Sequence, residues 1–165
     1  MQDTYPYDPE HGQQPMDQTP PQRAPELRTV AMPADTNANG DIFGGWLLAQ
    51  MDLAGGTYAI HAARGRVATV AIEAMSFHRP VYVGDLVSCY CQTERIGRTS
   101  LAVHVQTWVR RGFRGASGHE VQDLKVTEGV FTFVALDEQG AKRSLHIDKN
   151  TDKNTDKNTD KNTDK

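Results

Sequence analysis

The sequence predicts an α+β domain in which an antiparallel sheet curls around one long central helix. Two observations lead to this fold class. The segment 43–63 is apolar over the length of a helix, and strand-like runs separated by turns dominate the chain from residue 66 onward. A helix that is apolar on nearly every side needs protein around it, and a sheet meets that need by curling.

The expected helix over 43–63 contains few polar interruptions, which include Gln50, Asp52 and Thr57. Inside it, Gly55 and Gly56 each cost about 1 kcal/mol of stability relative to Ala. Such a pair within a helix predicts that another backbone approaches closely.

Strands are expected within 66–77, 86–95, 100–111 and 125–137, after a short strand or extended entry ahead of the helix. The last of these should place Val126, Val130 and Val134 on one face and Phe131 and Phe133 on the other. Because both faces are apolar, a second layer is needed, and we expect a homo-oligomer.

Composition divides the chain into three parts. Residues 1–26 hold six of the eight prolines among polar residues and are expected to be disordered, and residues 148–165 repeat four polar letters and are expected to form a solvated tail. The domain is therefore expected over residues 27–147, a usual size for one compact unit.

Charge and cysteine content argue against several classes of protein. The first 26 residues carry −4 and the tail is neutral, so a total of −3 leaves the core near +1, which argues against a general nucleic-acid binder. Cys89 and Cys91 share one face of a strand and cannot readily bridge, and no metal-ligand spacing is present. Without a leader or a long apolar span, neither a membrane partner nor a metal is expected, and the cytoplasm is the expected location.

The stretches "LRTVAMPADTNANGDIFGGWLLAQMDLAGG", "RVATVAIEAMSFHRPVYVGD", "RIGRTSLAVHVQTWVRR" and "VTEGVFTFVALDEQG" closely resemble the YciA-type acyl-CoA thioesterases of the hotdog fold. The resemblance covers the core from residue 27 to about 143. It implies a hotdog domain, dimers that join two sheets edge to edge, and assembly into hexamers as trimers of dimers. It also implies an acyl-CoA substrate, hydrolysed to a fatty acid and coenzyme A, and no separate cofactor.

Asp41 is the first candidate for catalysis, as general base on a water or as nucleophile. It stands just ahead of the helix, whose first backbone N–H groups lack intrahelical partners and carry the positive end of the dipole. Gly44 and Gly45 would let a thioester carbonyl reach those amides, which would stabilise its oxyanion. From position alone Asp41 also fits a helix cap or a turn, and the match across "NANGDIFGG" favours catalysis.

Asp52 is the rival acid, because a carboxylate in an apolar helix is costly to bury unless it is paired. Other hotdog thioesterase branches carry an acid at about this helix position, and the alternative is a structural acid bonded to backbone or to a dimer partner. Asn37 and Asn39 are expected to shape the loop before the helix through side-chain hydrogen bonds.

Coenzyme A carries phosphates, so cationic side chains and backbone donors should line its entrance. The candidates are Arg79 and, from the family's pantetheine stretch, Gly97, Arg98, Thr99 and Ser100. His78 and His104 show no acid partner in the sequence and are interpreted as packing or hydrogen-bonding residues.

Two other functions stay open from the sequence. A hotdog hydratase or dehydratase would be expected to pair a His with an acid near the helix, where this chain has Phe43. A non-catalytic acyl-CoA sensor or regulatory module would retain ligand and would not need Asp41.

Overall fold

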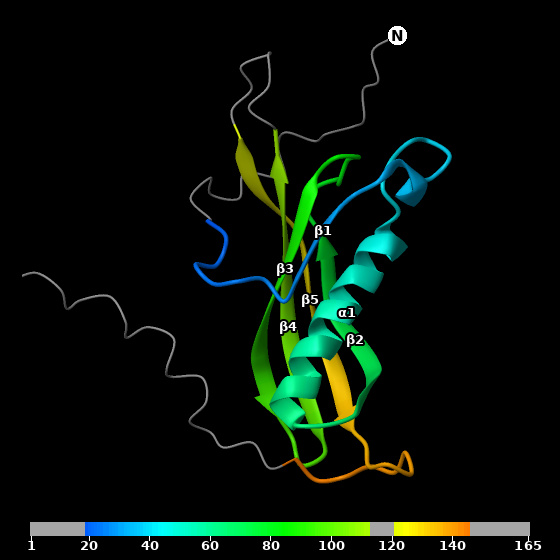
Figure 1. Cartoon of the computed structure of the whole chain (residues 1–165), viewed down its shortest axis with the longest axis vertical. Coiled ribbons are helices and arrows are strands. Elements are labelled where there is room, and N and C mark those ends of the chain that lie inside the picture. Colours follow the sequence, from blue (N-terminus) through cyan, green and yellow to red (C-terminus); the bar gives the residue numbers. More distant parts are fainter. Residues whose placement is uncertain (1–18, 113–120, 146–165) are drawn as a thin grey trace, which may run out of the picture.

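One helix lies across a face of a five-stranded antiparallel sheet in the computed structural model, which describes residues 19–112 and 121–145 (Figure 1). The elements are β1 (Leu27–Val30), a 3-10 turn η1 (Pro33–Asp35), α1 (Gly44–Ala63), β2 (Val67–Phe77), β3 (Leu86–Ile96), β4 (Ser100–Arg111) and β5 (Gln122–Ala135). The predictions for residues 1–18, 113–120 and 146–165 lie outside the described residues. The predicted class, a curled sheet around a single long helix, is confirmed.

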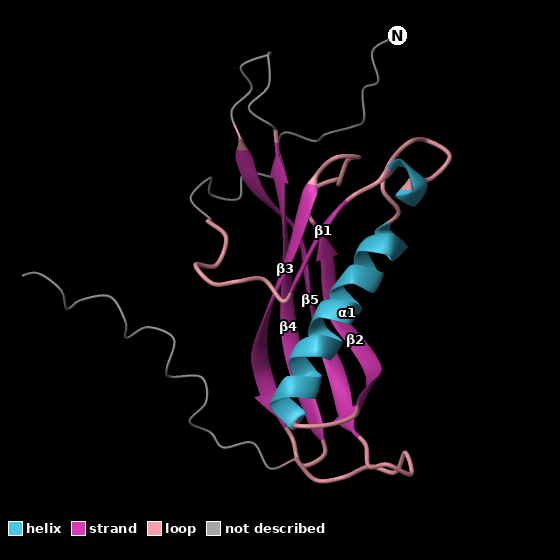
Figure 2. Ribbon diagram, viewed as in Figure 1, coloured by secondary structure: helices cyan, strands magenta, loops and turns pink. Residues whose placement is uncertain are grey.

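The sheet has the order β1-β3-β4-β5-β2, with every neighbouring pair antiparallel. Long strands β3, β4 and β5 form its centre, whereas β1 and β2 are edges (Figure 2). The chain enters at one edge with β1, passes through α1, and continues into the opposite edge strand β2. The helix is thereby tied to both edges of the sheet.

The core lies between α1 and the concave face of the sheet. Near the middle and end of α1, Met51, Ala54 and Ala59 pack on side chains of the central strands: Cys89, Cys91, Leu101, Val103, Val105, Phe131 and Phe133. Near the start of α1, Leu47 packs in a second cluster with Ala31, Val81, Val87, Val109 and Val126. Apolar side chains at these fully buried positions supply most of the stabilising free energy of such a domain.

The prediction that Val126 shares a face with Val130 and Val134 is wrong. A register shift sits where Thr107 pairs Thr127 and Trp108 pairs Lys125, so Val126 is the extra residue of a bulge in β5. The bulge turns Val126 into the cluster with Leu47, on the helix side of the sheet, instead of the outer face.

The glycine pair inside α1 has a different neighbour from the expected backbone. A Cβ built on Gly55 would meet the ring of Phe133 at 3.0 Å and Val105 at 3.4 Å, while one on Gly56 meets Phe133 only at 3.8 Å. Gly55 therefore lets the helix sit directly on the side chains of β4 and β5.

The side of α1 turned away from the central strands is exposed, and so are apolar side chains of the edge strand β2. Leu53 and Ile60 on the helix are 57% and 46% exposed, and Val70 and Ile72 on β2 are 57% and 42% exposed. In one copy of the chain the helix is thus covered on one side. Among the described residues, no helix combines the length and apolar character required to cross a membrane.

Candidate active site at the start of the helix

The loop before α1 is a tight turn organised by Asn37. The Asn37 amide donates to the carbonyl of Asp41 at 2.7 Å, and its side-chain oxygen accepts from the amides of Asn39 at 2.9 Å and Asp41 at 3.1 Å. Gly40 takes the left-handed conformation with φ +89, which favours glycine. The turn-forming role predicted for Asn37 is confirmed.

The first turn of α1 presents backbone donors that receive no hydrogen bond from the side chain of the N-cap residue. Phe43 is the N-cap residue and makes no side-chain cap hydrogen bond, while its carbonyl accepts from Trp46 and Leu47. Gly44 and Gly45, which follow, are exposed, and a Cβ on Gly45 would meet no atom within 4 Å. The amides at a helix start, together with the helix dipole, favour a negatively charged oxygen.

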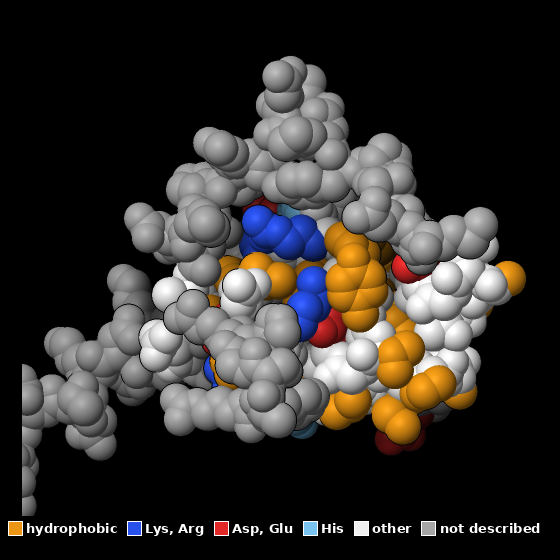
Figure 3. All heavy atoms as spheres, turned by 90° about the horizontal axis from the view of Figure 1, so that it is seen from above, with side chains coloured by type: hydrophobic (Ala, Val, Ile, Leu, Met, Phe, Trp, Pro, Cys, Tyr) orange, Lys and Arg blue, Asp and Glu red, His pale blue; other side chains and the backbone are white. Residues whose placement is uncertain are grey.

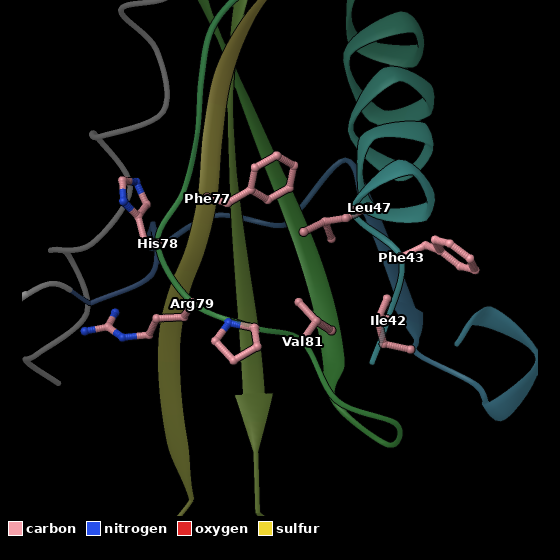
Figure 4. Close-up of a pocket in the computed structure, with 9 residues that line it drawn as sticks. Ile42, Phe43, Leu47, Phe77, His78, Arg79 and Val81 are labelled. Atoms are coloured by element: carbon pink, nitrogen blue, oxygen red, sulfur yellow. The ribbon is translucent and has the colours of Figure 1, made fainter. Parts of the chain in front are cut away.

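A pocket of about 360 Å³ opens beside this turn. Its lining residues are Ile42, Phe43, Gly44, Leu47, Phe77, His78, Arg79, Pro80 and Val81. Figure 4 shows Phe77, Leu47, Val81 and Ile42 directed toward one another, whereas the polar ends of His78 and Arg79 point away on the far side of the chain. The lining of the pocket is therefore mainly apolar, and its volume lies in the range of small-molecule sites.

Figure 3 shows the end of the molecule at which α1 begins. Exposed hydrophobic side chains gather there beside several Lys and Arg side chains. An apolar surface next to cationic groups suits a ligand that joins an apolar chain to an anionic part.

The two candidate acids occupy different places. Asp41 is half-buried in the loop, two residues before the N-cap, and its backbone is held by Asn37. Asp52 lies eight residues into α1, about 12 Å along the helix axis from Gly44. Its Oδ1 accepts a 2.7 Å hydrogen bond from the hydroxyl of Thr69 on the edge strand β2. Neither acid lines the pocket of its own chain.

The predicted coenzyme A residues are not brought together within one chain. Arg79 lies at the pocket, with its guanidinium bonded to the carbonyl of Lys125 at 3.1 Å. Gly97, Arg98, Thr99 and Ser100 form the β3–β4 turn at the opposite end of the sheet, where Thr99 accepts from Ala135 and Arg98 accepts from Leu145. The two groups are separated by roughly the 30 Å length of a 20-residue helix.

The interpretation of His78 and His104 as hydrogen-bonding residues is confirmed, and the structure adds an acid partner that the sequence did not show. Glu128 on β5 lies 3.4 Å from Nε2 of His78, 3.2 Å from Nε2 of His104 and 2.7 Å from Nζ of Lys125. Partial burial favours the neutral carboxyl, but the hydrogen bonds from Lys125 and His78 and the charge of His104 hold the pKa of Glu128 below its usual range. No sequence signal marks this cluster, because its members come together only through strand pairing and the end of β2.

Cys89 and Cys91 are free and lie on one face, as predicted, and both are buried. Burial raises the pKa of the Cys89 thiol to about 11 and also raises the pKa of Cys91. Neither is a nucleophile at neutral pH. Among residues 19–112 and 121–145, no three His, Cys, Asp or Glu side chains gather so as to hold a metal ion.

Known proteins resemble this chain over most of its length. A family model described as the thioesterase superfamily matches residues 39–112. The acyl-CoA thioester hydrolase YciA of Escherichia coli (strain K12) is 49% identical over 122 residues, which cover 74% of this chain and 90% of that protein.

Two solved structures agree with this match. HI0827, a hexameric broad specificity acyl-coenzyme A thioesterase, superposes with a TM-score of 0.68 at 48% identity, covering 77% of this chain and 84% of that one. Cj0915, a hexameric hotdog fold thioesterase of Campylobacter jejuni, superposes with a TM-score of 0.71 at 37% identity. The match covers 75% of this chain and 91% of that one. The chain therefore belongs to the YciA-type acyl-CoA thioester hydrolases, a hotdog-fold branch of the thioesterase superfamily.

Proposed function

We propose that this protein hydrolyses acyl-CoA thioesters to a carboxylic acid and coenzyme A. The observation that carries the proposal is the glycine-lined start of α1, which follows an N-cap residue without a side-chain cap and opens beside the pocket. The thioester carbonyl oxygen would accept from the amides of Gly44 and Gly45, and would be stabilised there as it becomes an oxyanion. The names of the relatives, which are acyl-CoA thioester hydrolases, agree with this reaction.

In the proposed reaction a carboxylate takes a proton from a water, whose oxygen attacks the thioester carbon. The tetrahedral oxyanion then collapses, the carbon–sulfur bond breaks, and the coenzyme A thiolate leaves with a proton returned by the carboxyl group. No Ser-His-Asp or Cys-His arrangement is required, because the thiolate is a good leaving group.

We assign the carboxylate role to Asp52, with Asp41 as the alternative. The Thr69 hydroxyl orients the Asp52 carboxylate at the open edge of the sheet, where solvent has access. Asp41, in contrast, belongs to the turn that Asn37 organises. Because Asp52 lies about 12 Å from the helix start of its own chain, its partner amides would come from Gly44 and Gly45 of a second copy.

A second copy also accounts for the exposed apolar surface of α1 and β2. Leu53, Ile60, Val70 and Ile72 would be covered if two sheets joined along β2, and such an isologous dimer is the commonest closed assembly. In the same dimer the β3–β4 turn of one copy would approach the helix start of the other, which would bring Arg98 to the coenzyme A of that site. Assembly into a hexamer follows the two hexameric structures that the chain resembles.

Three further expectations stay predictions. A cytoplasmic location is checked by fractionating cells that carry the chain, and recovery from the membrane or an exported fraction contradicts it. Activity that survives dialysis against a chelator checks the absence of a metal. Full activity of protein freed of small molecules by gel filtration checks the absence of a cofactor.

The test is thiol release from acyl-CoAs of several chain lengths, followed with a thiol-reactive dye. The buried Cys89 and Cys91 should add no background in the folded protein. We expect turnover by the wild type, loss of turnover in Asp52→Asn with the oligomer intact, and retained turnover in Asp41→Asn. Loss in Asp41→Asn alone would move the role to Asp41, and tight binding without turnover at any chain length would favour a sensor.

A further inference from the structure

Arg111, the last residue of β4, binds the connection between β2 and β3. Its Nε donates to Asp85 Oδ1 at 2.9 Å, and its Nη2 donates to Asp85 Oδ2 at 2.6 Å and to the carbonyl of Pro80 at 3.0 Å. The guanidinium also lies 4.3 Å from the ring centre of Tyr82. The planar guanidinium pairs two nitrogens with the carboxylate, donates to the carbonyl and lies over the ring, whereas an ammonium group has one nitrogen and no planar face.

Asp85 is the buried centre of this arrangement. Its side chain is 3% exposed and also accepts from the amide of Tyr82 at 2.9 Å. Its carbonyl accepts from Ala31 at 3.0 Å, and Gly84 donates to the carbonyl of Ala31 at 2.8 Å. The ion pair therefore ties the end of β4 to the 80–85 connection, and backbone hydrogen bonds tie the same connection to Ala31 after β1.

The same connection forms one wall of the pocket at the start of α1. Pro80 and Val81 line the pocket, and Val81 is 5% exposed because it packs with Leu47 and Val87. Opposite them the wall is Phe77 and Leu47 (Figure 4). Arg111 is bonded to the carbonyl of Pro80. Loss of this bond would therefore release Pro80 and Val81, and with them this wall of the pocket.

The chemistry of the pocket selects the part of the substrate that enters it. The pantetheine arm carries amides that would lose hydrogen bonds among Ile42, Leu47, Phe77 and Val81, whereas an aliphatic acyl chain loses none. The pocket is also continuous with Gly44, where the thioester carbonyl would lie under the proposed function.

We propose that this pocket receives the acyl chain, and that Arg111 is a positioning residue for acyl-chain selectivity because it holds the Pro80–Val81 wall through Asp85. The proposal rests on the proposed function for the position of the carbonyl. Arg111 does not touch the substrate, and it acts through the wall. The effect of Arg111 on substrate binding therefore grows with the length of the acyl chain that contacts Pro80 and Val81.

The decisive variant is Arg111→Lys, which keeps the positive charge beside Asp85 but has one nitrogen in place of the two that hold Asp85 in a bidentate pair while bonding Pro80. The matched control is Arg110→Lys. Arg110 is adjacent in β4 and makes an equally bidentate ion pair with Asp123, with both distances 2.9 Å, but it does not contact the 80–85 connection. We expect Arg111→Lys to lower the ratio of kcat/KM for decanoyl-CoA to that for acetyl-CoA about fivefold or more, mainly through KM, and Arg110→Lys to leave this ratio unchanged.

Binding of non-hydrolysable S-alkyl-CoA thioethers, measured by calorimetry, decides the same question without catalysis. Wild-type affinity should rise by up to about fourfold for each methylene buried, and this increment should shrink in Arg111→Lys. Val81→Ala, which alters the wall and leaves the ion pair intact, should shrink it as well. An unchanged increment in both variants, or an equal change in Arg110→Lys, would overturn the inference. A wild type that binds thioethers with this increment but hydrolyses nothing would instead overturn the proposed function.

Discussion

Asp52 Oδ1 on the helix and the Thr69 hydroxyl on the edge strand β2 lie 2.7 Å apart. The bond fixes the carboxylate at the part of the molecule where the exposed apolar side chains of α1 and β2 also lie. It is one of two side-chain bonds described here between α1 and the sheet, the other being Tyr58 to Thr93 at 2.9 Å.

The first prediction concerns Thr69→Val, which removes the hydroxyl and keeps the shape of the side chain. We expect kcat to fall about tenfold, the equivalent of one hydrogen bond to a charged group at about 1.5 kcal/mol. Steady-state thiol release measures it. The control is Thr93→Val, which removes the comparable bond to Tyr58 and should leave kcat unchanged. Equal losses in both variants would show a general effect of packing instead.

A second prediction separates stability from activity at Gly45. Since a Cβ there meets no atom within 4 Å and the residue is helical, Gly45→Ala should raise the free energy of unfolding by roughly 0.4–1 kcal/mol. The same methyl group would stand where the thioester is proposed to approach the amides, so kcat/KM should fall. Urea unfolding and thiol release measure the two effects. A variant that is both more stable and fully active would contradict the proposed oxyanion site.

The third prediction compares the neighbouring glycines of the helix. Gly55→Ala drives a methyl group to within 3.0 Å of the Phe133 ring, and we expect it to lower stability by about 1–3 kcal/mol. Gly56→Ala has 3.8 Å of space and should raise stability by up to about 1 kcal/mol. Thermal unfolding of the two variants measures both changes in stability. Effects of the same sign at both positions would mean that the helix does not rest on β5 as described.

The fourth prediction concerns pH and Glu128. Because the pKa of this carboxyl is lowered in the folded state, its ion pairs stabilise the fold above the ordinary glutamate pKa of about 4.3, and this stability is lost as pH falls through the folded-state value. His78, His104 and Lys125 all face this carboxylate.

The Tm difference between wild type and Glu128→Gln should therefore be large near pH 6 and should shrink toward pH 3. Glu94→Gln, at an exposed glutamate of β3, serves as the control and should show no such trend. A Tm difference that is constant with pH would show that the lost side chain, and not its charge, matters.

Local patterns were sufficient to predict the elements. The helix expected over 43–63 begins one residue later, and the strand expected over 100–111 has those bounds. The first segment is apolar over the length of a helix, and the second has the alternation of a strand. The bulge at Val126 was not predictable in this way, since one extra residue in β5 changes the face of a side chain without changing local composition.

The candidate site was predicted unevenly for a related reason. Asn37 organises its turn through contacts within four residues, which a sequence pattern can indicate. The Glu128 cluster and the Asp52–Thr69 bond join residues that are distant along the chain. The first depends on strand register, and the second on how the helix lies against β2. The ion pair between Arg111 and Asp85 joins residues that are 26 positions apart in the sequence, and it also depends on strand register.

Subunit mixing tests most directly the claim that Asp52 of one copy serves the helix start of another. Asp52→Asn and Gly45→Val should each be inactive. The first variant keeps the helix start intact, and the second keeps the carboxylate of Asp52. Oligomers reassembled from equal amounts should recover about one quarter of wild-type turnover, because half of the dimers are mixed and each holds one complete site. No recovery in reassembled mixed oligomers, together with inactive Asp41→Asn, would contradict the account and return the base to the chain that supplies the amides.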